Sequence, residues 1–389
     1  MSRRTRKRIR WKRLRRRARK SKSGLRGLTM KKSKTQEALE ELGNDLVKNV
    51  LAGKPPVMNV PVRALSNVSY NKKSETLELG DKTSERNFFN VAHAKKFLQT
   101  LEVAAKSKEL LTLGKHASLR DVFYMVKRTI PNTKTNIVDE QSESDNAIED
   151  LEALSGFSRE QLNINANKMG SVAGHVVIED KGDEIDWAKM GSGGWSVPSN
   201  VEEITFKKVR AKYVIYMEKA AVWERLHEDK FWDKQNCIIM SSQGQTTRGI
   251  RRLLQRLSQE HDLPIYVLAD FDPWGFYIYS VLKFGSINLA HMSGSMTLNT
   301  ARFLGITADD IENYGLKKML ITFKDVDQTR LKQLQNYEWF QNNKAWQRQF
   351  KLMATMKAKA EIQALSSRGI SFITEKYLPE KIKKGEFLQ

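Results

Sequence analysis

Apolar residues in the first half of the chain recur every three or four positions, which is the spacing of one helix face. The first such run begins at Thr35 and ends before the Gly-Lys-Pro-Pro sequence at 53–56, and a second covers about 90–108. Between them, residues 65–70 and 74–79 are short runs of strand type on either side of a polar turn. The pattern therefore predicts two helices separated by a small hairpin.

A third helical run begins at Ser118. Ser118 and Asp121 have the spacing of a capping box, in which the hydroxyl accepts from one free amide and the carboxylate accepts from another. We expect this helix to start at Ser118 and to end at Pro131, because proline breaks the backbone hydrogen-bond ladder. Helical spacing then continues through the acidic stretch 139–154.

The second half alternates strands and helices. It contains three short apolar runs of strand length, at 213–217, 237–240 and 264–269. A helix is predicted at 246–261, between the last two runs, and the Gly-rich segment 191–194, ahead of all three, is predicted to be a connecting loop. Strand, helix and strand in this order indicate a parallel sheet with right-handed crossovers, which places this half in the α/β class.

A chain of 389 residues is long enough for two or three domains, at roughly 100–200 residues each. Helices with a small hairpin and basic flanks suit a winged-helix (CAP-like) DNA-binding module, although the same coarse pattern fits many α+β folds. We expect an α/β multidomain protein with a basic tail (1–34), an N-terminal helix and linker (35–64), a winged-helix domain with a connecting segment (65–205), and a second domain with a C-terminal extension (206–389).

Positive charge is concentrated at the N-terminus. The net charge is +22, and residues 1–34 hold 18 Lys and Arg with no acid. Such a segment is expected to stay disordered until a polyanion neutralises it. DNA is the obvious partner, but a tail bound to RNA or the ribosome, or an extension that the working protein does not need, also fits.

The remaining composition indicates an intracellular protein. The single cysteine, Cys237, lies in an apolar run and gives no basis for a disulfide scaffold, a thiolate zinc site or cysteine redox chemistry. No apolar stretch approaches the roughly 20 residues needed to span a bilayer, so we expect no membrane partner. A cytoplasmic, nucleoid-associated location follows from the basic tail.

Acidic residues follow two of the predicted parallel strands. Glu218 ends the first strand, and Asp270 and Asp272 end the third. Carboxylates this close raise one another's pKa unless a cation lies among them, and oxygen ligands favour Mg2+. The alternative is that these acids cap helices or pair with arginines of the predicted helix, namely Arg248, Arg251 and Arg252. The combined pattern favours the metal site.

Two motifs carry a family resemblance. Val-Ile-Tyr-Met-Glu-Lys-Ala at 214–220 and Leu-Ala-Asp-Phe-Asp-Pro-Trp-Gly at 268–275 resemble the Toprim domain of topoisomerases and primases, in the form found in the A-subunit family of type IIB topoisomerase VI. Leu-Arg-Asp-Val-Phe-Tyr at 119–124 resembles that family's R-D-x-Y-Y signature. The stretches 139–145 and 275–291 also match its pattern. The resemblance spans about residue 65 to the C-terminus; Phe123, where a first tyrosine is common, and the basic tail are departures.

The resemblance implies DNA cleavage by transesterification. Tyr124 would attack a backbone phosphorus, forming a 5′-phosphotyrosyl bond and releasing a 3′-hydroxyl. Arg120, one helical turn earlier, can grip the phosphate beside the phenol. Mg2+ held by the three acids would offset charge on the phosphate. Asp121 could also take part in catalysis, but its role as a helix cap is sufficient to explain its position. For Tyr124 considered alone, the ordinary role would be that of an aromatic side chain packed in the core.

Further contacts and partners are implied. Lys115 and His116, just before the nucleophile helix, and Gln243 and Gly244, in a turn after the second strand, are weaker candidates for touching DNA. One tyrosine cuts one strand, so a double-strand break requires a homodimer, in which the family pairs one protomer's tyrosine with the other's metal site. The chain has no G-x-x-x-x-G-K-[ST] nucleotide loop. ATP is therefore expected to be used by a separate B subunit in an A2B2 heterotetramer.

The leading hypothesis is the DNA-cleaving and rejoining subunit of an ATP-dependent type IIB topoisomerase. The nearest alternative is a recombination-initiating transesterase that cuts double strands without passing them. A non-enzymatic DNA-binding scaffold with a decayed metal site is a third reading. A hydrolytic Toprim nuclease is a weaker fit because it has no use for the Arg-Asp-Val-Phe-Tyr helix.

Overall fold

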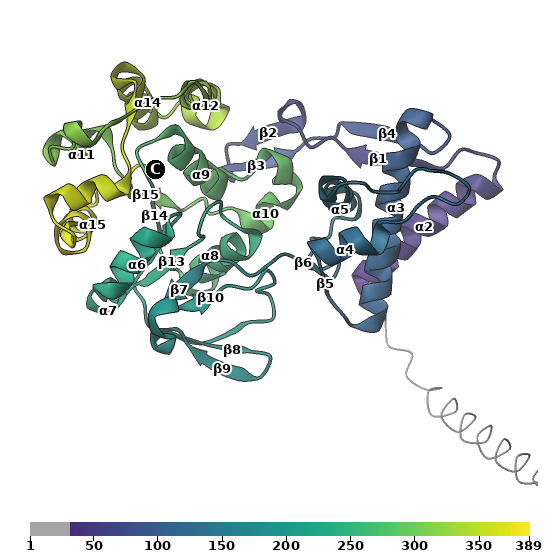
Figure 1. Ribbon diagram of the computed structural model, residues 1–389, viewed down its shortest axis with the longest axis horizontal. Helices are drawn as coiled ribbons and strands as arrows, with labels where there is room; N and C mark the ends of the chain where they lie inside the picture. Colours follow the sequence, from purple (N-terminus) through teal and green to yellow (C-terminus); the bar gives the residue numbers. More distant parts are fainter. Residues whose placement is uncertain (1–31) are drawn as a thin grey trace, which may run out of the picture.

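The computed structural model describes residues 32–389 (Figure 1). The predicted basic tail lies outside these residues except for its last three positions. The helices are α2 (Lys34–Leu51), α3 (Val91–Leu113), α4 (Leu119–Val126), α5 (Gln141–Ser155), α6 (Ala220–Glu228), α7 (Phe231–Lys234), α8 (Arg248–His261), α9 (Pro273–Phe284), α10 (Ser293–Met296), α11 (Ala308–Asn313), α12 (Asp325–Asn336), α13 (Glu338–Gln341), α14 (Lys344–Met356) and α15 (Leu378–Lys384).

The strands are short, and several have only two residues. They are β1 (Val57–Pro61), β2 (Val68–Asn71), β3 (Thr76–Leu79), β4 (Thr83–Asn87), β5 (Ala117–Ser118), β6 (Ile164–Asn165), β7 (Ser171–Ala173), β8 (Val176–Asp180), β9 (Asp183–Asp186), β10 (Trp195–Ser196), β11 (Thr205–Val209), β12 (Val214–Met217), β13 (Ile238–Ser241), β14 (Ile265–Leu268), β15 (Arg302–Phe303), β16 (Ile321–Thr322) and β17 (Ala358–Lys359).

Two main cores divide the described chain into two units, and a smaller cluster of buried residues in the first unit contains Leu46, Met58, Val60 and Phe97. The first core lies among α2, α3, α4 and α5 and contains buried residues from Leu39 to Ile164. The second core is larger; it contains Leu77 and then buried residues from Val172 to Leu378. Figure 1 shows the two units side by side, with the helical first unit at the right.

A six-stranded mixed sheet organises the second unit. Its strand order is β10-β7-β13-β12-β14-β15, in which β12 pairs in parallel with β13 and β14, and β15 continues the parallel part. The predicted parallel sheet is therefore confirmed. All four residues of β12, β13 and β14 are buried, as expected of strands covered by helices on both faces.

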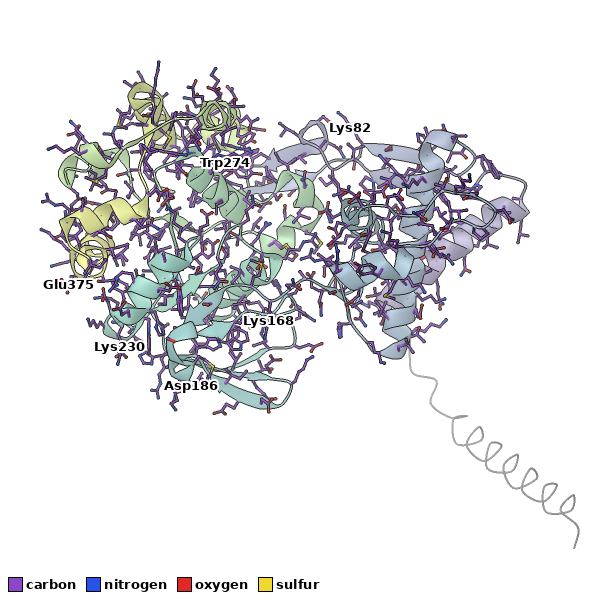
Figure 2. The ribbon with its side chains drawn as sticks, in the orientation of Figure 1. Lys82, Lys168, Asp186, Lys230, Trp274 and Glu375 are labelled. Carbon is purple, nitrogen blue, oxygen red and sulfur yellow. The ribbon has the colours of Figure 1, made fainter. Side chains whose placement is uncertain are left out.

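The boundary between the units differs from the expected one near residue 205. Val172 and Val197 pack in the second core, because β7 pairs antiparallel with β13 and β10 pairs with β7. The hairpin β2–β3, expected in the first domain, also packs there through Leu77. The chain thus crosses between the units three times, and Lys82 and Lys168 mark two of these crossings in Figure 2.

Two local predictions need correction. Helix α4 ends at Val126, five residues before Pro131, because Lys127 is extended and Thr129 forms a bridge with Asn136 across the turn that holds the proline. The Gly-rich segment is not a plain loop: Gly191–Gly193 forms a 3-10 turn that leads directly into β10 at the sheet edge.

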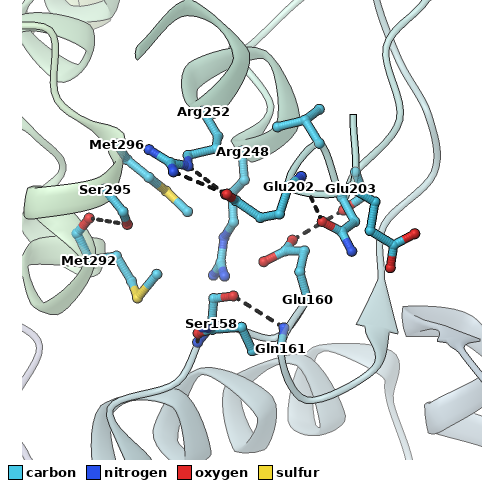
Figure 3. A pocket seen from close by; sticks show the side chains of 13 residues that line it. Ser158, Glu160, Gln161, Glu202, Glu203, Arg248, Arg252, Met292, Ser295 and Met296 are labelled. Atoms are coloured by element: carbon cyan, nitrogen blue, oxygen red, sulfur yellow. Dashed lines mark hydrogen bonds and ion pairs between the residues drawn. The ribbon is translucent and has the colours of Figure 1, made fainter. Parts of the chain in front are cut away.

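An interface rich in charge joins the units. Arg248 of α8 donates two hydrogen bonds to Glu152 of α5, at 2.5 and 3.0 Å, and Glu152 is fully buried. Beside this pair lies a cavity of about 470 Å³ (Figure 3), lined by Glu160 from the first unit and by Glu202 and Arg252 from the second. A buried charge is costly unless it is closely paired, so the Arg248–Glu152 ion pair constrains the packing of α8 against α5.

Among residues 32–389, no helix has the length and apolar composition that crossing a membrane requires.

Candidate functional site

Helix α4 presents Tyr124 to solvent. Ser118 is the N-cap, its hydroxyl accepts from the Asp121 amide, and the Asp121 carboxylate accepts from the Ser118 amide, so the predicted capping box is confirmed. Val122 and Val126 are fully buried and anchor one face of the helix in the first core. The opposite face leaves Tyr124 60% exposed, so its phenol is not part of the core.

The Arg120 side chain lies against Tyr124. One guanidinium nitrogen is 3.4 Å from the phenol oxygen, and the guanidinium carbon is 5.3 Å from the ring centre. A second guanidinium nitrogen donates to Gln141 at the start of α5, at 2.7 Å. Gln141 therefore holds the cation beside the phenol.

Asp121 is occupied by the helix cap. Its carboxylate accepts from the amide of Ser118 at 2.9 Å and from the Ser118 hydroxyl at 2.7 Å. These hydrogen bonds lower the pKa of the Asp121 carboxyl. Its contacts account for a structural role and show no connection to the Tyr124 phenol.

The parallel register brings the acidic segments to one edge of the sheet. Met217 of β12 is aligned with Ser241 of β13 and with Leu268 of β14, so the three strands end together. Glu218 directly follows the end of β12, and Asp270 lies two residues after the end of β14. This is the edge where parallel sheets bind ligands.

Asp270 is buried and bound through both of its carboxylate oxygens. Oδ2 accepts from the Lys219 ammonium at 2.7 Å, and Oδ1 accepts from the Ile362 amide at 2.9 Å. Burial raises the pKa of the Asp270 carboxyl, and Lys219 opposes that shift. Lys219 also pairs with Glu361 at 3.1 Å.

The other two acids at this edge, Asp272 and Glu218, both have raised pKa values. Asp272 is the N-cap of α9 and accepts from the Gly275 amide. Burial, together with the charges of Asp270 and Glu218, raises the pKa of Asp272 to about 6. Burial and the nearby Asp270 also raise the pKa of Glu218. The three acids are thus close enough to repel one another.

In the described residues, these three acids do not form a preformed metal-binding site. Across residues 32–389, no three carboxylate, histidine or cysteine side chains stand close enough to hold one ion together. The donor set still suits a hard divalent cation, since the carboxylates repel one another and, among the described residues, only Asp270 of the three forms an ion pair with an ammonium. Lys219 supplies positive charge where the sequence predicted metal.

The alternative role for the acids is only partly realised. Asp272 does cap a helix, as that alternative expected. The three arginines of α8 have other partners: Arg248 binds Glu152, Arg252 binds Glu202, and Arg251 donates to backbone carbonyls.

The weaker DNA candidates lie in two exposed turns. Lys115 and His116 are exposed between α3 and β5, next to the start of α4. Gln243 has a positive φ of 57° and is exposed, and the Gly244 amide donates to the Glu218 carbonyl at 3.1 Å. One turn therefore adjoins the tyrosine helix and the other adjoins the acidic edge.

Sequence reasoning missed three residues of the site. Lys219 directly follows Glu218 in the first motif, so its position was visible, but its partner was not. Gln141 lies 21 residues from its partner Arg120, and Glu361 lies 142 residues from its partner Lys219, so no local pattern marks either of them. Contacts of this kind arise only from tertiary packing.

Comparison with protein-family models gives three matches along the chain. Residues 95–164 match the model described as type IIB DNA topoisomerase. Residues 163–210 match the all-beta domain in DNA topoisomerase VI alpha subunit, and residues 213–382 match the Toprim domain model for the A subunit of topoisomerase 6 and Spo11. The last match contains Glu218, Asp270 and Asp272.

Curated proteins show the same similarity over nearly the whole chain. The A subunit of type 2 DNA topoisomerase 6 from Pyrococcus abyssi is 45% identical, covering 91% of this chain and 95% of the relative. The proteins of the same name from Pyrococcus horikoshii and Hyperthermus butylicus are 44% and 38% identical, covering 91% and 92% of this chain and 95% and 97% of those relatives. The chain belongs to the family of A subunits of type 2 DNA topoisomerase 6.

Proposed function

We propose that this chain is the DNA-cleaving and rejoining subunit of an ATP-dependent type IIB topoisomerase. The observation that carries the proposal is an exposed tyrosine, held beside a guanidinium on a capped helix, in a family member whose second unit presents an acidic sheet edge. Both features come from the motifs that resemble the family.

Tyr124 is the proposed nucleophile. Its phenol oxygen attacks a backbone phosphorus, a phosphorus–oxygen bond to tyrosine forms, and the bond to the deoxyribose 3′-oxygen breaks. The phenol proton leaves and the 3′-oxygen takes one up, so one phosphodiester replaces another and the reverse step reseals the strand. Arg120 stabilises the negative charge on the phosphate as the attack proceeds.

Glu218, Asp270 and Asp272 would hold the divalent ion, which we propose is Mg2+. When bound, this ion supplies positive charge for the scissile phosphate and the leaving oxygen. The carboxylates themselves orient that charge at the end of the sheet. This role is supported by the chemistry of the donor set and by the Toprim family match at 213–382.

The first unit is the proposed DNA-binding module. Its helices α3, α4 and α5 with the antiparallel pair β1–β4 are consistent with a winged-helix arrangement. Lys115 and His116 would contact phosphate beside Tyr124, and Gln243 and Gly244 would do so beside Glu218. These contacts would place the duplex between tyrosine and acids.

Double-strand cleavage requires two copies of this chain. We propose a homodimer in which the tyrosine of one copy and the acids of the other act on one phosphodiester, together with two ATP-hydrolysing B subunits. The relatives are named as A subunits, which implies that a second kind of chain completes the enzyme. ATP would drive the passage of a second duplex through the break.

Trapping of the covalent adduct tests the nucleophile. With the ATPase partner, supercoiled DNA and Mg2+, a denaturant quench should leave a nucleotide on the peptide that contains Tyr124, detected by mass spectrometry. Tyr124→Phe should abolish the adduct and keep duplex binding, while Tyr70→Phe should leave both unchanged. An adduct that persists in Tyr124→Phe would refute the assignment, and breaks without ATP-dependent relaxation would indicate a transesterase that does not pass strands.

A further inference from the structure

The ammonium of Lys219 is surrounded by oxygen acceptors. It lies 2.7 Å from Oδ2 of Asp270, 3.1 Å from Oε2 of Glu361 and 3.0 Å from Oε1 of Gln363. A lysine ammonium has three hydrogens to donate, so these three partners account for all of them. The side chain is 27% exposed, which leaves the ammonium open to exchange.

The position of Lys219 conflicts with cation binding at Asp270. Oδ1 of Asp270 is taken by the Ile362 amide at 2.9 Å, and Oδ2 is taken by Lys219. A divalent ion that binds Oδ2 must therefore share that oxygen with the ammonium or displace it. The ammonium also places one positive charge beside the site, which repels a cation.

The other two acceptors can keep the ammonium after that displacement. Glu361 is 50% exposed, so it can follow the lysine. The backbone beneath them is fixed, because Phe271 and Ala360 exchange two hydrogen bonds of 2.9 Å each. The side chains can thus rearrange while the segment stays in place.

We propose that Lys219 is a built-in counter-ion that competes with the divalent cation for Asp270, and that Glu361 and Gln363 receive its ammonium when the cation binds. This inference rests on the proposed metal role of the acids. Lys219 is a positioning residue: it holds the acidic edge together without metal and sets how weakly metal binds.

Direct measurement of metal binding tests this. Mn2+ is added to the full chain without DNA, and the free ion is counted by electron paramagnetic resonance. Lys219→Met removes the charge and keeps the length of the side chain, so it should bind Mn2+ at least about tenfold more tightly than wild type. Lys219→Arg keeps the charge and should bind within about threefold of wild type. Lys207→Met, which breaks an exposed pair with Glu179, is the matched control and should change nothing.

A purely structural lysine predicts the opposite sign. If Lys219 only braced Asp270, Lys219→Met would lose Mn2+ affinity, and that result, in a variant whose circular dichroism matches wild type, would overturn the inference. If Lys219→Met does not fold, the Mn2+ affinities of Lys219→Arg and Glu361→Gln are compared with that of the wild type. Glu361→Gln should weaken Mn2+ binding at least threefold, because the displaced ammonium loses its charged acceptor. An unchanged Mn2+ affinity in Glu361→Gln would refute the exchange.

Asp272→Asn separates this inference from the proposed function. Loss of Mn2+ binding in that variant supports the acids as ligands. Binding that depends on Asp272 but is no tighter in Lys219→Met rejects the counter-ion role alone. Binding that is the same in wild type and Asp272→Asn rejects the metal site, and the counter-ion role with it.

Discussion

At the scale of single residues, Arg120 links helices α4 and α5 beside Tyr124, the proposed nucleophile. Its planar guanidinium reaches the phenol of Tyr124 and the amide oxygen of Gln141 at the same time. Lysine cannot replace this geometry, because a single ammonium has no fixed fork. The direction of the Arg120 charge is therefore part of the proposed chemistry.

Arg120→Lys should slow covalent adduct formation by about 10²-fold, the usual order for loss of one oriented donor to a developing charge. Quenched time courses of adduct formation measure this. Arg128→Lys, which alters the exposed pair with Glu102, should have little effect. An Arg120→Lys rate equal to wild type would show that the guanidinium has no such part.

The two possible roles of Asp121 lead to different results. If it only caps α4, Ser118→Ala and Asp121→Ala should each cost about 1 kcal/mol of stability and should lower cleavage equally. Thermal unfolding and adduct yield measure the two effects. A much larger loss of cleavage in Asp121→Ala than in Ser118→Ala, at equal stability, would indicate a direct catalytic part.

At the scale of elements, the start of α9 shapes the acidic edge. Gly275 lies so close that an added Cβ would be 2.8 Å from the Asp270 carbonyl and 3.0 Å from Oδ1 of Asp272. The turn between β14 and α9 therefore closes only around a glycine. This glycine connects the helix cap with the positions of both acids.

Gly275→Ala should destabilise the chain by roughly 1–3 kcal/mol, the usual cost of overpacking, and should weaken Mn2+ binding. Thermal unfolding and metal titration measure these effects. Gly294→Ala is a suitable control, since nothing lies within 4 Å of its added Cβ. Equal behaviour of the two variants would contradict the close contact at Gly275.

The strong local patterns were sufficient to predict the main elements. The buried strands β12, β13 and β14, the amphipathic helix α8 and the capping box at Ser118 all follow from periodicity and cap chemistry. The two-residue strands β10 and β15 could not be predicted in this way, because they exist only through pairing with distant strands.

The site was predictable in part for the same reason. Local motifs marked Tyr124 and the three acids, and the register of the sheet places Glu218 and Asp270 at one edge. The contacts of Lys219 and Gln141 depend on how separate elements pack. Sequence spacing carries no signal for such contacts.

At the scale of the whole molecule, the interface between the two units holds tyrosine and acids in a fixed relation within each chain. Arg248 and Glu152 form its buried ion pair, and Arg63 binds Asp150 of α5 at 2.9 Å nearby. His291 also belongs to this interface, and neither of its ring nitrogens has a hydrogen-bond partner among the described residues. The loss or gain of one charge at this interface should therefore change the stability of the chain.

Arg248→Ala should cost about 3–5 kcal/mol, because Glu152 would be left buried and unpaired. Arg348→Ala, which breaks an exposed pair with Asp309, should cost 1 kcal/mol at most on the usual scale of roughly 0–1 kcal/mol. Denaturant unfolding compares them. Equal costs would show that the buried pair does not hold the units together.

His291 should make the interface sensitive to acid. Burial and the charges of Arg248 and Arg63 lower the pKa of His291 to about 4. Between pH 6.5 and pH 4, His291 is therefore protonated in the unfolded chain but mostly neutral in the folded chain. The free energy of unfolding should fall over this range by on the order of 2 kcal/mol. His291→Gln should lose less stability over that range. An identical pH dependence in both proteins would contradict this.

The measurement that tests the account most directly uses mixed dimers, in which one copy carries Tyr124→Phe and the other carries Asp272→Asn. Asparagine also serves as an N-cap, so α9 keeps its start. If the tyrosine of one copy works with the acids of the other, this dimer retains one complete site and, with the B subunit, ATP and Mg2+, cuts one strand of supercoiled DNA. The account predicts nicked circles with protein attached through Tyr124; no cleavage, or breaks in both strands, would contradict it.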